Sequence, residues 1–101
     1  MRVISKASLV RFWTKHPSSI QALLTWFEDA SHAKWIGPQD IKLRYASASF
    51  VGSNRVVFNI KGNEFSLVVA VAYRFAAVYI KFVGTHRQYD AVDAATVESS
   101  S

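Results

Sequence analysis

Cysteine is absent from the 101-residue chain. Neither a disulfide framework nor a thiolate site is therefore possible, and a reducing compartment is the natural inference. Long hydrophobic runs are also missing, because the longest uncharged apolar stretch, residues 65–73, is far too short to span a bilayer. Residues 1–13 contain basic residues without a continuous apolar run. We expect a soluble cytoplasmic protein that does not enter a membrane.

Acidic residues are scarce over most of the chain. Residues 1–89 contain all 12 lysines and arginines and only four acids, a net charge of +8, whereas residues 90–101 contain three acids and no base. A basic body with a short acidic tail predicts a polyanionic partner, with nucleic acid ahead of membrane because no basic amphipathic helix stands out. The alternative is that the charge serves solubility alone.

Residues 54–86 have the alternating pattern of consecutive β-hairpins. After a first strand that ends near Ile60, Gly62 and Asn63 suit the central positions of a type I′ turn. That turn pairs Asn59 with Ser66, so apolar side chains share one face and polar ones the other. We expect a core on the first face and a polar platform on the second. A third strand over residues 76–83 should end at Gly84 and Thr85.

The remaining segments complete an α+β domain. A strand is expected over residues 1–6, a helix over 7–16, a corner at Pro17 and a second helix as far as about His32. The two helices should form an antiparallel hairpin on one face of a mostly antiparallel sheet. Pro38 is a candidate first residue of a short helical segment over 39–44. Trp35 and Tyr45 should anchor this connection to the core.

The chain contains no repeat or linker, so residues 1–97 should form a single domain. Within it, a strand is expected over residues 47–51, followed by a turn over 52–54. A last helix or turn is expected over residues 89–97. Residues 98–101 should be a frayed tail.

The polar platform holds groups that could bind RNA and cut it. Arginine and lysine contact phosphates, tyrosine stacks on bases and histidine transfers protons. The set comprises Arg55, Asn59, Lys61, Ser66, Tyr79, Lys81 and His86. The alternative is that these residues are the solvated surface of a basic sheet protein. The face of Tyr79 also depends on a turn at Arg74 and Phe75 that lacks glycine and asparagine.

The three histidines differ in context. His16 and His32 lie at expected helix ends, where capping or packing is the simplest role, and their spacing from His86 predicts no metal site. His86 follows a strand, with Arg87 and Tyr89 close by, which could place an imidazole beside a cation and a phenol. The alternative is that Thr85 caps a final helix and His86 is incidental.

Several segments resemble the HigB toxins of the RelE/ParE superfamily. They are RVVFNIKGN (residues 55–63), LVVAVAY (67–73) and VYIKFVGTHRQYD (78–90), together with Phe12, Trp13, His16, Pro17, Trp35, the segment 38–41 and Tyr45. The resemblance covers nearly the whole chain. It implies a RelE-like fold and a bacterial type II toxin that cleaves mRNA on the ribosome as a metal-independent endoribonuclease without a cofactor. It also implies a HigA-type antitoxin as partner.

Two positions depart from the family pattern. Ser66 stands where the family usually has a basic residue, the arginine expected to face the scissile phosphate. Gln88 stands where glutamate is frequent. The first change could weaken the enzyme. Because Ser66 is expected on the solvated platform, we expect Ser66→Arg to raise cleavage and to change the stability little.

The interpretation assigns a role to each candidate residue. His86 would act as acid or base, Arg55 and Lys61 would stabilise the phosphate, and Tyr89 would stack on or orient a base. RNA-binding residues would be Lys81, Asn59, Arg74 and Arg87. Two alternatives stay open: a non-catalytic module that binds RNA or the ribosome, and a ParE-like inhibitor of a topoisomerase.

Overall fold

The chain folds in the order β-α-α-α-β-β-β-β-α, with two single 3-10 turns. A computed structural model describes residues 1–52 and 54–98, so Ser53 of the expected 52–54 turn lies outside the described residues. The elements are β1 (Arg2–Ile4), α1 (Lys6–Lys15), η1 (Pro17–Ser19), α2 (Ile20–His32), α3 (Pro38–Arg44), β2 (Ser49–Val51), β3 (Arg55–Ile60), β4 (Phe65–Ala72), η2 (Tyr73–Phe75), β5 (Ala77–Thr85) and α4 (His86–Asp90).

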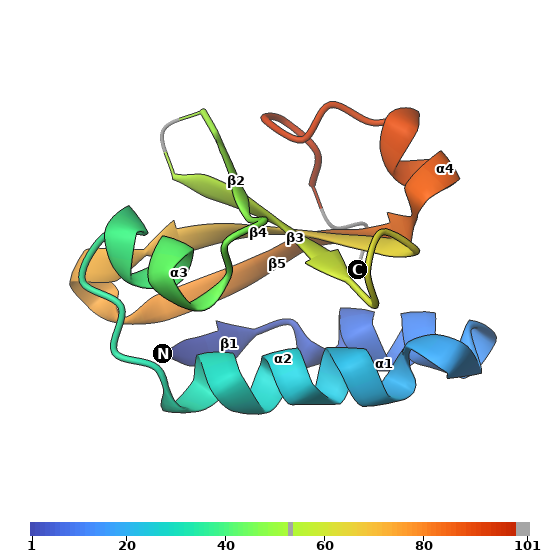
Figure 1. The fold of residues 1–101 in the computed structure, drawn as a ribbon, viewed down its shortest axis with the longest axis horizontal. Helices are drawn as coiled ribbons and strands as arrows, with labels where there is room; N and C mark the ends of the chain where they lie inside the picture. Colours follow the sequence, from blue (N-terminus) through green and yellow to red (C-terminus); the bar gives the residue numbers. More distant parts are fainter. Residues whose placement is uncertain (53, 99–101) are drawn as a thin grey trace.

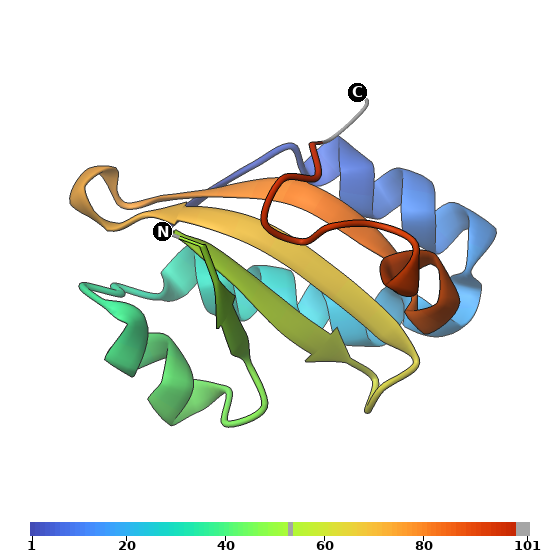
Figure 2. The same ribbon diagram turned by 90° about the horizontal axis from the view of Figure 1, so that it is seen from above.

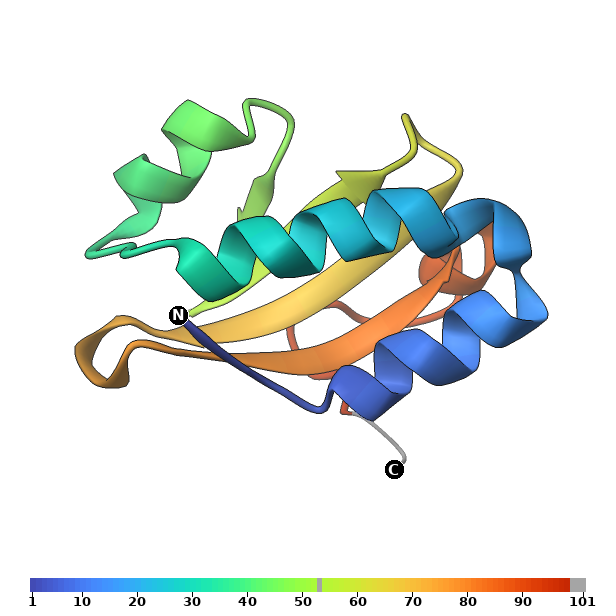
Figure 3. The ribbon, with the colours of Figure 1, turned by 90° about the horizontal axis from the view of Figure 1, so that it is seen from below.

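The five strands form one sheet in the order β1-β5-β4-β3-β2. Only β1 runs parallel to its neighbour, β5, and the other pairs are antiparallel. Helices α1 and α2 lie side by side beneath one face of the sheet (Figures 1 and 3). The predicted α+β class and the two-helix hairpin on one sheet face are thereby confirmed.

The core between helices and sheet is centred on Phe58. Its ring contacts Trp26 and Tyr45 edge-on, at centroid distances of 5.4 and 5.0 Å, and it stacks with Trp35 at 6.3 Å. Aromatic pairs at these distances add to the gain from burial. Trp35 and Tyr45 therefore anchor the segment around α3 to the core, as the sequence predicted.

Prolines mark the helix boundaries. The first helix ends at Lys15, where the N–H of His16 donates to the carbonyl of Phe12, and Pro17 then opens η1. Proline disfavours helical backbone in the residue before it, which explains the break at His16. Pro38 occupies the first turn of α3, where its missing N–H costs nothing.

The β3–β4 hairpin has the predicted register with a different turn. Asn59 pairs with Ser66, and the last strand pair joins Ile60 to Phe65. The positive φ angles, however, fall at Lys61 (54°) and Gly62 (65°), so the prediction of Gly62 and Asn63 as a type I′ turn is wrong. Because residues 61–64 all lie outside the strands, the chain reverses over four residues, and its left-handed positions come one residue earlier.

The opposite face of the sheet is not a polar platform, contrary to prediction. The C-terminal segment, residues 91–98, crosses this face (Figures 1 and 2). Val57, Val68 and Ala94 form a second buried cluster there, with Phe82 and other partly buried side chains packed against it. The small and apolar residues at these outward positions therefore contact the covering segment rather than solvent.

The last strand contains an irregularity that strict alternation could not predict. Val69 pairs with Ile80 and Val68 with Phe82, so Lys81 is the extra residue of a β-bulge. The strand also continues to Thr85, two residues beyond the predicted end. Before it, Ala76 takes the left-handed φ (52°) that the glycine-free turn requires. Among the described residues, no helix has the length and apolar character needed to cross a membrane.

Candidate functional site

His86 lies at the junction of β5 and α4. Thr85 caps the helix: its hydroxyl accepts from the N–H of Gln88 at 3.2 Å, and the Gln88 side chain accepts from the N–H of Thr85 at 2.9 Å. The Thr85 cap, which the sequence offered as part of the alternative in which His86 is incidental, is therefore present, and it fixes where His86 leaves the strand. The imidazole is 62% exposed, 3.7 Å from a carboxylate oxygen of Asp90, with the Tyr89 ring centroid at 6.5 Å.

The turn that carries Lys61 lies at the same end of the sheet. The backbone N–H of His86 donates to the carbonyl of Glu64 at 3.1 Å, and Thr85 pairs with Phe65. Lys61 Nζ lies 3.5 Å from a carboxylate oxygen of Glu64, and both side chains are about half exposed. A lysine and a histidine from segments 25 positions apart in the chain therefore flank one exposed edge.

Asn59 and Arg87 belong to this end as well. Asn59 on β3 stands in one row with Ser66 and Gly84, and its side chain donates to the carbonyl of Ser47 at 3.3 Å. Arg87 is exposed on α4, next to His86. Arg74 lies in η2, beyond the other end of β4 and β5, so the structure separates it from the rest of the predicted set.

Arg55 and Lys81 are bound to the C-terminal segment. The Arg55 guanidinium donates to the carbonyls of Ala94 and Val97 and to Glu98 at 2.6 Å, and its side chain is only 10% exposed. Lys81 Nζ donates to the other oxygen of Glu98 at 2.7 Å. These hydrogen bonds, first from Lys81 and then from Arg55, lower the pKa of the Glu98 carboxyl. Glu98, expected to begin a frayed tail, thus bridges two predicted phosphate-binding residues.

Ser66 requires a correction. It was expected on a solvated face, but its exposed fraction is 2%, because Gly84 of β5 is its neighbour and the adjacent Phe82 packs closely around that glycine. A Cβ placed on Gly84 would lie 2.6 Å from Phe82 Cζ. A long side chain at Ser66 therefore does not have the free space that the sequence interpretation assumed.

Two carboxylates near the candidate residues were missed by the sequence analysis. Asp90 follows His86 by one helical turn, and this i, i+4 spacing could have predicted its contact. Glu98 offered no such signal, since its partners lie 17 and 43 positions earlier in the chain. Within residues 1–52 and 54–98, no three His, Cys, Asp or Glu side chains are placed to hold a metal ion.

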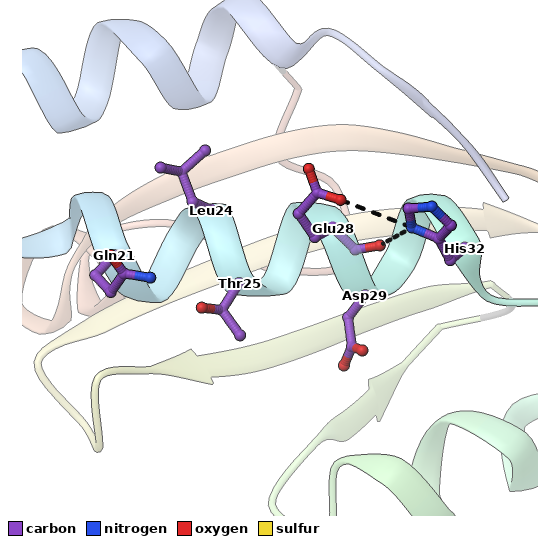
Figure 4. Close-up of a pocket in the computed structure, with 6 residues that line it drawn as sticks. All are labelled: Gln21, Leu24, Thr25, Glu28, Asp29 and His32. Atoms are coloured by element: carbon purple, nitrogen blue, oxygen red, sulfur yellow. Dashed lines mark hydrogen bonds and ion pairs between the residues drawn. The ribbon is translucent and has the colours of Figure 1, made fainter.

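The other histidines serve packing and capping contacts. The ring of His16 stacks on Phe12 at a centroid distance of 4.4 Å. His32 Nδ1 lies 2.9 Å from the carbonyl oxygen of Glu28, at the end of α2 (Figure 4). The surface hollow drawn there, about 400 Å³, contains Glu28 and Asp29 and none of the predicted site residues. Its acidic lining does not suit a polyanion.

A partly exposed hydrogen-bonded network attaches α3 to α2 near this hollow. The hydroxyl of Tyr45 donates to Asp29 at 2.6 Å, and Arg44 donates to the same oxygen at 2.8 Å. The hydrogen bond from Tyr45 is the main reason that the pKa of Asp29 is lowered, while burial raises the pKa of Tyr45. The network holds structure together at a distance from His86.

Comparison with known proteins identifies one family. A family model described as HigB_toxin, the RelE-like toxic component of a toxin-antitoxin system, matches residues 19–92, which include β2 to β5, α4 and His86. No curated protein matches the chain.

Proposed function

Because the chain belongs to the HigB family of RelE-like toxins, we propose that it stops translation by cleaving mRNA on the ribosome. As the toxic component of a toxin-antitoxin system, it has an antitoxin partner. We propose that this partner is a HigA-type protein, and that the toxin works in the cytoplasm. We further propose that the cleavage uses side chains of this chain alone, without a cofactor.

The reaction defines what the protein must provide. In RNA cleavage of this kind, the 2′-hydroxyl attacks the adjacent phosphorus and the 5′-oxygen leaves. A base must take the hydroxyl proton, an acid must protonate the leaving oxygen, and cations must stabilise the charge on the phosphorane. Holding the RNA in line for attack supplies much of the remaining acceleration.

The exposed imidazole of His86 is the observation that supports this proposal most. It stands at a fixed strand-to-helix junction, close to the phenol of Tyr89, and the turn carrying Lys61 lies against its backbone. In our proposal His86 transfers a proton, Lys61 and Arg87 contact the phosphate, and Tyr89 stacks on a base.

In our proposal, Arg55 and Lys81 contact RNA only after their ion pairs with Glu98 break. Both are engaged with Glu98, so either can reach an RNA phosphate only when that carboxylate moves away. Asn59, at the edge of the same face, would contact the sugar or base. Arg74 would touch only RNA that extends to the far end of the sheet.

Primer extension on a reporter mRNA, with and without ribosomes, tests the proposal. We expect wild-type protein to cut only with ribosomes, and His86→Gln to cut about a hundredfold more slowly, the usual loss for a general acid or base. The matched control is His32→Gln, since His32 is also exposed and also has a carboxylate one helical turn away. Equal cleavage by the His86 variant would reject the assigned role.

The same preparation separates the alternative functions. A non-catalytic ribosome-binding module would inhibit translation without producing cut ends. A topoisomerase inhibitor of the ParE kind would damage DNA and leave mRNA intact. Cut mRNA together with undamaged DNA supports the nuclease and contradicts both alternatives.

A further inference from the structure

A groove runs between α1 and the C-terminal segment. The first strand covers the edge of β5 only at residues 77–79, and α1 packs against β5 as well. The C-terminal segment passes over the sheet beside this edge (Figure 2). The space between them has a volume of about 530 Å³, and its lining includes Arg11, Lys15 and His16 from the helical side and Lys81 from β5. We call it the basic groove.

The cations from α1 are exposed, and Arg11 also donates a hydrogen bond to Ser8 Oγ at 3.4 Å. Arg11 and Lys15 are one helical turn apart and exposed, so they project from the same side of α1. Within the described residues 1–52 and 54–98, neither of them forms an ion pair. His16 contributes a half-buried ring that Phe12 holds from behind. An aromatic ring between cations suits a nucleotide, with its flat base and charged phosphate.

The groove already binds one anionic group. Glu98 is the only carboxylate among its described lining residues, and its two oxygens are held separately by Arg55 at 2.6 Å and Lys81 at 2.7 Å. Two cations that bind two oxygens of one anion provide the contacts that a phosphodiester also needs. The pKa of Glu98 is lowered by those same contacts, so the carboxylate is charged at neutral pH.

We propose that the basic groove binds the sugar-phosphate backbone of single-stranded RNA, and that Glu98 occupies one phosphate position until RNA displaces it. Arg11 and Lys15 contact phosphates at one side of the groove, and Lys81 and Arg55 contact the phosphate that replaces the carboxylate. The choice of RNA as the polyanion rests on the proposed function. Binding at this groove is nevertheless a separate property from cleavage at His86.

The first test measures binding of a fluorescein-labelled oligouridylate by anisotropy over a range of salt concentrations. Each phosphate contact on a single strand contributes about 0.7 to the slope of log K against log salt. Arg11→Gln with Lys15→Gln should lower that slope by about 1.4. The matched control is Arg2→Gln with Lys34→Gln, an exposed arginine and lysine outside the groove. Equal slopes in both double variants would overturn the proposal.

The second test concerns the internal competitor. Glu98→Gln should tighten RNA binding by about threefold or more, because it removes the closed state that RNA must displace. Glu28→Gln removes the same charge from an exposed site on α2 and is the control. If both variants change the affinity equally, Glu98 acts only through net charge and does not occupy a phosphate position.

These binding tests can fail independently of the proposed function. His86→Gln should keep the RNA affinity of the wild type and lose ribosome-dependent cleavage. RNA binding with the expected salt slopes but no cleavage in any condition would reject the nuclease and keep the groove. Cleavage by wild-type protein, with binding insensitive to Arg11 and Lys15, would reject the groove alone.

Discussion

At the scale of single residues, Ser66 is buried on the sheet face that the C-terminal segment crosses (Figure 2), where the sequence predicted exposure to solvent. On an open sheet face, a serine at this position could be replaced by a longer polar residue at little cost. In this structure Ser66 is 2% exposed and pairs with Gly84, against which the ring of Phe82 packs closely. An arginine at this position would need space that the buried site does not offer.

We therefore expect Ser66→Arg to lower the free energy of unfolding by roughly 2–4 kcal/mol, because a charged side chain would be forced into a buried site. This replaces the earlier expectation of a small effect. Urea denaturation of the variant and of Ser66→Ala, which adds neither size nor charge, would measure it. Wild-type stability in a Ser66→Arg variant that also cleaves faster would show that the side chain reaches the RNA without strain.

At the scale of elements, α4 links stability to the orientation of His86. The helix has only five residues, and the reciprocal bonds between Thr85 and Gln88 satisfy two of its first N–H groups. Gln88 makes this bond at the position where the resemblance led us to expect a glutamate. A glutamine at this position therefore completes the capping box.

We expect Thr85→Ala to cost about 1 kcal/mol of stability, the usual loss for a helix N-cap, and Thr85→Ser to cost less because the hydroxyl remains. If the cap also orients His86, Thr85→Ala should reduce cleavage more than a substitution elsewhere in the chain that costs the same stability. Thermal unfolding alongside primer extension would separate the two effects. Full cleavage by a destabilised Thr85→Ala variant would confine Thr85 to a structural role.

Local sequence signals predicted most of these elements, and nonlocal contacts explain the errors. The register from Asn59 to Ser66 and the break before Pro17 depend on neighbours in the chain, so pattern and backbone chemistry were sufficient. The bulge at Lys81 shows only in the pairing of β4 with β5, and the cover over Val57 comes from the segment 91–98. No spacing in the sequence reports such contacts.

The same distinction applies to the candidate site. The position of His86 at a capped strand end could be predicted, since Thr85 and the end of the strand are adjacent to it in sequence. The burial of Arg55 and its ion pair could not be predicted, because its partner Glu98 lies 43 positions later in the chain. Only the three-dimensional path of the C-terminal segment shows that Glu98 lies between Arg55 and Lys81.

At the scale of the whole molecule, the fold places the acidic C-terminal segment over a cationic side of the sheet. The basic groove, the edge with His86 and Lys61, and the clamped Arg55 all lie on or beside the part of the sheet that α2 leaves uncovered. Residues 90–98, which hold all three acids of the C-terminal tail, are folded back onto that side (Figure 2). The molecule therefore partly neutralises its own cationic surface, which a net charge of +5 alone does not show.

The parallel pairing of β1 with β5 has a consequence for the order in which the protein is made. Residues 2–4 leave the ribosome well before their partners, residues 77–79, are synthesised. Closing so long a loop is slow compared with forming the β3–β4 hairpin. We expect pulse-labelled hydrogen exchange to show protection of the hairpin amides before those of β1; simultaneous protection would contradict this order. A nascent chain would thus lack the β1–β5 pair, and with it one edge of the sheet, until residues 77–79 have left the ribosome.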